Sequence, residues 1–401
     1  MSWNERVETL RLPNGLTLHY QYYPEDVSSV VLLYRAGSAY ERSGRTGVAH
    51  ILEHLMFNGS RNYGPFSLYI DAWGGQDNAF TDRDITVYHT VVPTSRVADV
   101  LRLEADRMRN LLFAHFEAEK RVILEEYLLS ENEDDERLWT EIFAHLWPDS
   151  PYSHPVSGWP EDVRNLTLKD VRDFYDRLYR PNNALLTVVS RLPLEKVLGE
   201  VENSFGNLEP YEEIRHPNHG MPTYRWFKRS VVRANRPKRF IVAFRLPQPS
   251  LRYNTAINVL TRVLDLERSS PLWPLIESGK MEMFNVRNYE YAGGNVLVIV
   301  GEVAPTRSPP VEDILAILES MPVDTPAVGR VKRMFKSEFV FSYEEVESVG
   351  INVALTAYLF GRVPTLSESL SLYDSITAED LQAVKRDIIS SPVVVAAYEN
   401  P

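Results

Sequence analysis

The sequence has 401 residues, 44% of them hydrophobic and 24% charged, which is the composition of a globular protein and favours two domains of about 200 residues. Its net charge of −12 argues against binding to nucleic acid or anionic membranes, and the lack of cysteine excludes disulfides, thiolate metal sites and a cysteine nucleophile. Without a long apolar run or a basic, apolar leader, it is expected to be a soluble, cytoplasmic protein.

Residues 5–42 are predicted to form three β-strands. Pro13-Asn14-Gly15 is a strong hairpin turn signal between two apolar, β-branched runs, and a third run ends at Ala36-Gly37. The predicted strands cover residues 7–12, 16–23 and 29–35.

An amphipathic helix is predicted next, over Thr46–Phe57. Its apolar residues fall on one arc of the helix, and His50, Glu53 and His54 fall on the opposite arc. Histidines four residues apart lie one turn from each other, so both imidazoles can hold one metal ion, and Glu53 lies beside them. This H-x-x-E-H spacing is the inverted zinc-peptidase motif. The alternative is a solvated helix face that happens to hold two histidines.

Further elements follow in the first half. A short helix is expected over 66–72, a strand over 76–81 after Gly74-Gly75, and a second strand over 85–92. Helical patterns then cover 95–111 and about 116–147, and a loop rich in proline, serine and glycine runs from 148 to 160.

The second half repeats the first. Thr167-Leu-Lys-Asp170 and Thr377-Ala-Glu-Asp380 are both capping boxes that start a helix, and each helix is followed by a strand. The predicted fold is therefore α+β, with two tandem homologous αβ sandwich domains and helices on one face of a mainly antiparallel sheet. The expected boundaries are a domain over 1–210, a linker over 211–236 and a second domain over 237–401.

The second half has no counterpart of the histidine motif. After Leu246 it reads Pro-Gln-Pro-Ser-Leu-Arg-Tyr-Asn-Thr-Ala-Ile-Asn-Val-Leu. Only the first domain is thus predicted to be catalytic, and the second is expected to form the opposite wall of a substrate chamber.

A catalytic zinc needs three protein ligands, and the long helical stretch offers several glutamates. Glu119 and Glu126 share a face two turns apart, with Val122 and Ile123 nearly on that face, which predicts that the face is partly buried. A buried carboxylate is unfavourable unless it is paired or binds metal. This favours Glu126 as the ligand and Glu119 as a carboxylate that orients a histidine or the substrate, although an ordinary acidic stripe remains an alternative. The other glutamates are expected to face water: Glu117, Glu125 and Glu131.

Three stretches together resemble the pitrilysin family of zinc metallopeptidases, which includes insulin-degrading enzymes, the mitochondrial processing peptidase and smaller bacterial peptidases. They are Gly47–Gly59, Gly74–Thr81 and Glu119–Glu126. The resemblance implies one zinc per chain, held by His50, His54 and Glu126, and peptide hydrolysis with Glu53 as the general base on zinc-bound water. It also assigns Glu119 to the catalytic residues.

The family's second motif implies that Asn78, Ala79 and Phe80 bind an extended substrate along a strand edge by β-augmentation. A plain edge strand is the alternative for these three residues. Active members commonly carry an arginine and a tyrosine seven apart in the second domain, and the comparable stretch here, Gly293–Val303, has neither at that spacing. The hypothesis is therefore a zinc-bearing subunit in a homodimer, or in a heterodimer with a related subunit that carries the arginine–tyrosine pair. The competing function is a non-catalytic scaffold or assembly subunit.

Overall fold

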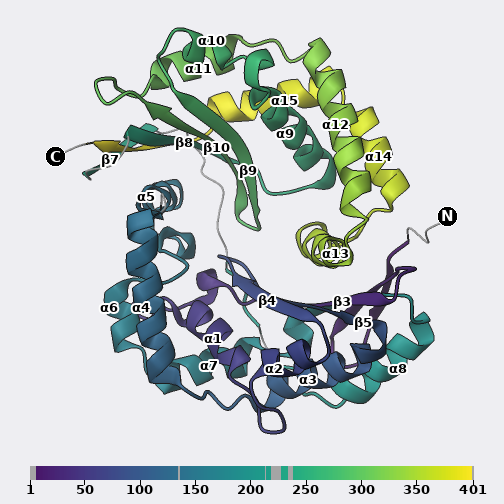
Figure 1. The fold of residues 1–401 in the computed structure, drawn as a ribbon. Helices are drawn as coiled ribbons and strands as arrows, with labels where there is room; N and C mark the ends of the chain where they lie inside the picture. Colours follow the sequence, from purple (N-terminus) through teal and green to yellow (C-terminus); the bar gives the residue numbers. More distant parts are fainter. Residues whose placement is uncertain (1–5, 134–135, 213, 218–226, 234–237, 400–401) are drawn as a thin grey trace. The chain divides into compact units, whose positions relative to one another are not determined.

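The computed structural model describes residues 6–133, 136–212, 214–217, 227–233 and 238–399, and its chain divides into two compact units (Figure 1). The first unit comprises residues 1–129, 154–217 and 340–367, and the second comprises residues 130–153, 218–339 and 368–401. Each unit thus includes one segment from the opposite half of the sequence.

The first unit contains a six-stranded sheet with the order β1-β2-β6-β3-β5-β4. Its strands pair antiparallel, except that β2 and β6 are parallel. The strand bounds are Glu8–Arg11 (β1), Thr17–Tyr22 (β2), Val27–Tyr34 (β3), Gln76–Thr81 (β4), Thr86–Pro93 (β5) and Ala184–Ser190 (β6).

Helices cover both faces of this sheet. Because side chains alternate along a strand, Val30 and Leu32 point into the main core, whereas Val31 and Leu33 pack against α13 (Val346–Phe360) on the other face. The other helices of the unit are α1 (Val48–Phe57), α2 (Phe66–Ala72), α3 (Val97–Asn110), α4 (Phe116–Glu133), α6 (Pro160–Asn165), α7 (Leu168–Leu178) and α8 (Leu194–Phe205).

The second unit contains a five-stranded sheet with the order β7-β11-β8-β10-β9. Its strands are β7 (Phe227–Arg233), β8 (Lys238–Leu246), β9 (Met283–Tyr291), β10 (Gly294–Val303) and β11 (Val393–Glu399), all antiparallel except the β7–β11 pair. Its helices are α5 (Glu136–Leu146), α9 (Leu251–Leu264), α10 (Trp273–Glu277), α11 (Val311–Ser320), α12 (Pro326–Ser342), α14 (Leu366–Ser375) and α15 (Ala378–Ser390). The core lies between the sheet and helices that include α9 and α15, and α5 packs on β7, β8 and β11.

Both sheets have the same order if β2, β6, β3, β5 and β4 are matched with β7, β11, β8, β10 and β9. The capping boxes at Thr167 and Thr377 are formed as predicted and start α7 and α15. The predicted class, a duplicated α+β sandwich with mainly antiparallel sheets, is confirmed. The placement of α13 on the second sheet face is an addition that the sequence pattern did not indicate. The boundaries at 1–210, 211–236 and 237–401 stay a prediction, and residues 213, 218–226 and 234–236 of that linker lie outside the described residues.

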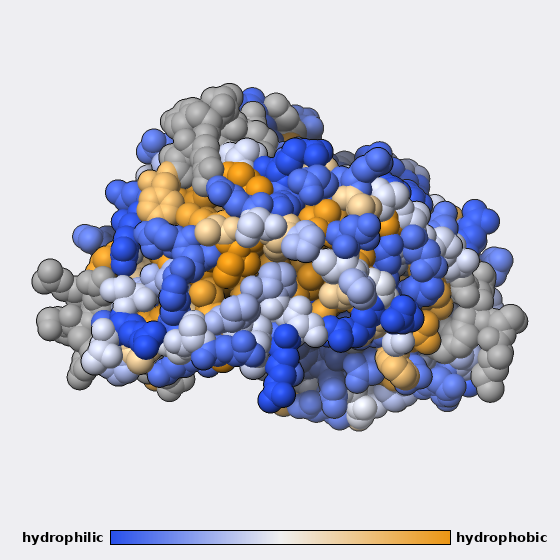
Figure 2. Space-filling view, turned by 90° about the horizontal axis from the view of Figure 1, so that it is seen from above, coloured by the Kyte–Doolittle hydropathy of each residue, from blue (hydrophilic) through white to orange (hydrophobic). Residues whose placement is uncertain are grey.

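None of the described helices is both long enough and apolar enough to cross a membrane. Figure 2 views the molecule from the side on which α10 and α11 lie in Figure 1, and hydrophobic side chains lie there in patches between hydrophilic ones. Individual exposed apolar side chains are normal on protein surfaces.

Candidate metal centre

Helix α1 begins at an unusual backbone position. Gly47 has a φ of +89°, and a Cβ atom there would lie 2.7 Å from the carbonyl oxygen of Ser157, so only glycine fits. The free N–H groups of the first turn are bound by Glu41, which accepts from Gly47 N at 2.9 Å and from Ala49 N at 2.8 Å. Burial raises the pKa of Glu41 well above its usual range, although these backbone bonds oppose the shift. Glu41 lies six residues before the N-cap residue Gly47, so no local capping pattern indicated its role.

The two faces of α1 differ as the periodicity predicted, with one exception. Val48, Ile51 and Leu52 are among the fully buried residues, whereas His50 and His54 are partly exposed and their ring centroids lie 4.9 Å apart. The exception is Glu53, which is only 9% exposed rather than facing solvent. Its carboxylate therefore lies in a largely dry environment between α1 and the sheet.

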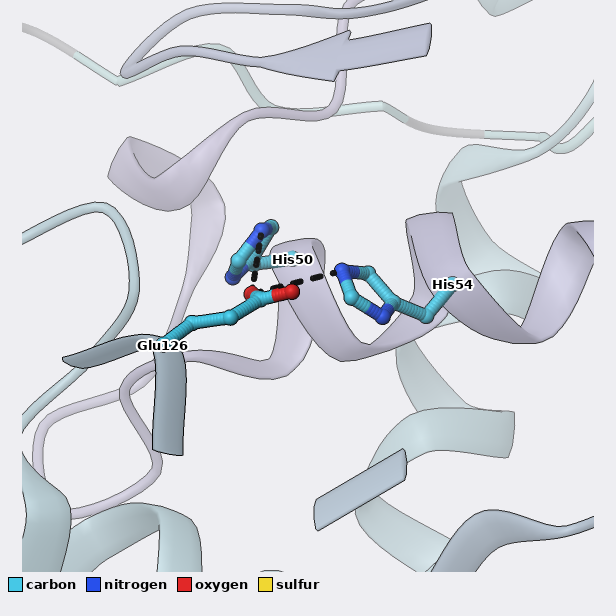
Figure 3. Close-up of side chains that lie close together, drawn as sticks. All are labelled: His50, His54 and Glu126. Carbon is cyan, nitrogen blue, oxygen red and sulfur yellow. Dashed lines mark ion pairs between the residues drawn. The ribbon is translucent and has the colours of Figure 1, made fainter. Parts of the chain in front are cut away.

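His50, His54 and Glu126 meet at one point (Figure 3). The Nε2 atoms of His50 and His54 lie 3.9 and 3.7 Å from the same Glu126 oxygen, Oε2, and the three ligand atoms lie within 4.8 Å of one another. Zinc bonds of about 2.0–2.2 Å in tetrahedral geometry require ligand atoms about 3.3–3.6 Å apart, so the two histidine–carboxylate distances exceed the required separation by only a few tenths of an ångström.

The chemistry of these donors also fits a metal ion. Burial, with a smaller contribution from His54, lowers the pKa of His50 to about 4, so its imidazole is neutral near pH 7 and has a free lone pair. Two imidazoles and a carboxylate leave a fourth position open, which is the arrangement of a catalytic zinc site. Among the described residues, these three form the one group of this kind.

Glu53 is held beside this group by β4. Thr81 Oγ1 donates a hydrogen bond to Glu53 Oε2 at 2.5 Å. Burial raises the pKa of Glu53, the Thr81 hydrogen bond and His54 oppose that shift, and Glu126 adds to it. Sequence reasoning did not single out Thr81, although it is the last residue of the second family motif.

Glu119 lies behind His54. Its Oε2 atom is 3.2 Å from His54 Nδ1, and its Oε1 atom accepts a hydrogen bond from Asn58 Nδ2 at 2.8 Å. The predicted burial of the face that Glu119 and Glu126 share is only partly correct, because Ile123 is fully buried but Val122 is 40% exposed. The Glu126 side chain is itself 45% exposed, so it lies at the rim of the buried face and reaches the histidines from there.

Asn78, Ala79 and Phe80 lie on β4, which is the last strand of its sheet and pairs only with β5 among the described strands. The Asn78 side chain is exposed, and its Oδ1 accepts from Ala79 N at 2.9 Å. Ala79 packs against the main core, whereas Phe80 packs against the cluster beneath α13. These three residues therefore do not join the metal group, but Thr81 at the end of the same strand contacts Glu53.

The chain is a duplicated α+β sandwich, and one unit carries the inverted H-x-x-E-H motif on a helix. A glutamate distant in sequence joins the two histidines. This combination defines a class of zinc metallopeptidase-like proteins. Two consecutive family models match the chain. Residues 18–158 match the insulinase family, peptidase family M16, and residues 165–321 match the inactive domain of peptidase M16. The chain belongs to this insulinase family.

Among its relatives is the zinc protease PqqE of Helicobacter pylori, which is 30% identical over 281 residues, or 67% of this chain and 63% of that protein. Another is the "Probable mitochondrial-processing peptidase subunit beta" of Schizosaccharomyces pombe, 29% identical over 213 residues, or 52% of this chain and 47% of that protein. The chain thus spans about half to two thirds of these relatives. A crystal structure of a protease from Helicobacter pylori has the same fold, with a TM-score of 0.88 at 24% identity and coverage of 98% of this chain and 99% of that one. These relatives suggest that the chain is a peptidase.

Proposed function

We propose that this chain is a zinc-dependent endopeptidase that hydrolyses peptides or unfolded polypeptides. The observation that carries the proposal is the convergence of His50, His54 and Glu126 at one point, next to a buried carboxyl on the same helix. Zinc, one ion per chain, would supply Lewis acidity for the scissile carbonyl and for the attacking water.

The chain's own residues supply the proton transfers. Glu53 accepts the proton of the attacking water and later delivers it to the leaving amine. Its pKa is raised by burial, which makes it a stronger base than an exposed glutamate. Thr81 holds one carboxylate oxygen of Glu53, so the other stays free to face the water. Glu119 orients the His54 ring from behind.

Substrate binding is assigned to the edge of the sheet. An extended peptide would add to β4 beside Asn78, Ala79 and Phe80 and form main-chain hydrogen bonds that require little sequence preference. Because β4 also carries Thr81, a peptide bound along this edge would pass close to Glu53.

The catalytic domain in this proposal is residues 1–210, and residues 237–401 form the opposite wall of the chamber. β10 contains neither an arginine nor a tyrosine, and a second copy of this chain would lack them too, so their absence supports pairing with a related subunit that provides them. A homodimer is the alternative assembly in this proposal. One relative is itself named as a subunit of a processing peptidase. A cytoplasmic location remains an expectation.

The test combines metal analysis with cleavage of a denatured protein by the purified chain, alone and with its co-purifying partner. We expect one zinc per chain, loss of cleavage with EDTA, and recovery with added zinc. A Glu53→Gln variant should keep zinc but lose about 10²- to 10⁴-fold in rate, because the general base is removed and the ligands are not. A preparation that binds no zinc and cleaves nothing even with its partner would favour the competing function, a scaffold or assembly subunit.

A further inference from the structure

Asn58 is the residue that ends helix α1, one turn beyond His54. Its backbone N–H donates to Leu55 O, and its side chain turns back toward α4, where Nδ2 donates to Glu119 Oε1 at 2.8 Å. The side chain therefore does not bond to its own helix, and it links the end of α1 to the helix that carries Glu126.

Glu119 uses its two carboxylate oxygens for two different partners. Oε1 accepts from Asn58, and Oε2 lies 3.2 Å from His54 Nδ1. A carboxylate held by one contact can still rotate about its last bond, whereas two contacts on different oxygens fix its plane. When Glu119 Oε2 accepts a hydrogen bond from His54, Nδ1 is the ring nitrogen that carries the proton, and the lone pair of Nε2 points toward Glu126.

The other histidine has no such support. The Nδ1 atom of His50 is buried without a hydrogen-bond partner among the described residues. Of the two histidines, only His54 thus has a side chain, Glu119, that fixes the orientation of its ring.

We propose that Asn58 is a positioning residue of the metal centre, which fixes the Glu119 carboxylate and through it the His54 ring. The inference rests on the metal-binding part of the proposed function. It gives a role to Asn58, a residue to which the family resemblance assigned none. Asn58 contacts neither the metal ligands' donor atoms nor a substrate position, so its effect is expected on zinc affinity before any effect on cleavage.

The first test measures the zinc dissociation constant by competition with a chromogenic chelator, without substrate. Asn58→Ala should raise the dissociation constant about 10-fold, within the 10- to 100-fold range typical of such supporting groups. Asn62→Ala is the matched control, because Asn62 lies in the same loop but donates to Asp106 and not to Glu119. Asn58→Asp should weaken zinc binding more than Asn58→Ala, because the new carboxylate would face the carboxylate of Glu119.

The second test separates positioning from a helix-end effect. In a Glu119→Ala background, Asn58→Ala should no longer change zinc affinity, because the carboxylate through which it acts is gone. An undiminished effect in that background, or unchanged affinity in the single variant, would overturn the role of Asn58. A parent chain that binds no zinc would overturn this inference and the proposed function together. Zinc binding without cleavage would count against the proposed peptidase activity but not against the role of Asn58.

Discussion

Two equivalent places in the duplicated fold carry different chemistry. Helix α1 follows β3 in the first unit, and α9 follows β8 at the matching place in the second. Each helix has a pair of nitrogen-bearing side chains four residues apart: His50 and His54 on α1, and Asn254 and Asn258 on α9. Each of the two helices therefore presents a pair of polar side chains on one face.

The two pairs of side chains differ in the partners that they bind. Asn254 exchanges hydrogen bonds with Asn295 and accepts from Ser250 N, while amides of Asn254 and Asn258 bond to Glu290 on β9. Burial raises the pKa of Glu290, and these amides oppose the shift. Amides are both donors and acceptors and can satisfy one another, whereas neutral imidazoles direct lone pairs at a shared point. The chemistry thus follows from residue type and not from position in the fold.

The largest expected effect comes from making the first helix resemble the second. His50→Asn with His54→Asn would replace both imidazoles by amides, which are poor zinc ligands, so zinc binding and cleavage should fall more than about 10³-fold. Zinc content and peptidase rate measure this. Unchanged zinc content in the double variant would contradict the comparison.

Acid should destabilise the first unit selectively. His19 on β2 is 4% exposed, and its pKa is lowered to about 4, first by burial and then by Arg35; the matching strand β7 has no histidine. Because the folded pKa is below the unfolded value, the unfolded state binds the proton more tightly. The stabilisation is complete above about pH 6.5 and is lost as the pH falls toward 4, in total about 3 kcal/mol.

Denaturant unfolding between pH 4 and 7 tests this, with local unfolding followed by hydrogen exchange in each unit. His19→Gln should flatten the pH dependence of the first unit. An equal pH slope in the parent and the variant would show that His19 is not the group that titrates.

A third effect concerns how the two helices begin. Gly47 starts α1 with a positive φ, whereas Ser250 starts α9 in an extended conformation with no side-chain cap. Gly47→Ala would require a left-handed alanine whose Cβ meets Ser157 O and Val163, at a cost of about 2 kcal/mol. Ser250→Ala should stay within about 0.5 kcal/mol. Thermal unfolding of both variants measures the difference, and equal losses would remove the special role of Gly47.

Local pattern was sufficient for much of the site. The spacing of His50, Glu53 and His54 depends only on helix geometry, and the resemblance located Glu126 on the next long helix. The sequence could not show that Glu41 caps α1 or that Thr81 bonds to Glu53, because those contacts join residues from separate elements. It also predicted burial around Val122 that the structure does not have, since helix periodicity gives a face but not the neighbour that covers it.

The smallest effect tests whether the polar cluster of α9 is structural only. Asn254→Ala would leave the Ser250 N–H without its acceptor and would remove one of the partners of Asn295, so it should destabilise the second unit by about 1 to 2 kcal/mol. Zinc affinity should not change, since Asn254 is not one of the residues of the metal group. Asn288→Ala is a milder control, because Asn288 makes one bond to the same Asn295 oxygen. If Asn254→Ala weakened zinc binding as strongly as Asn58→Ala, the two clusters would be energetically coupled, and the second unit would influence the metal centre from within its own core.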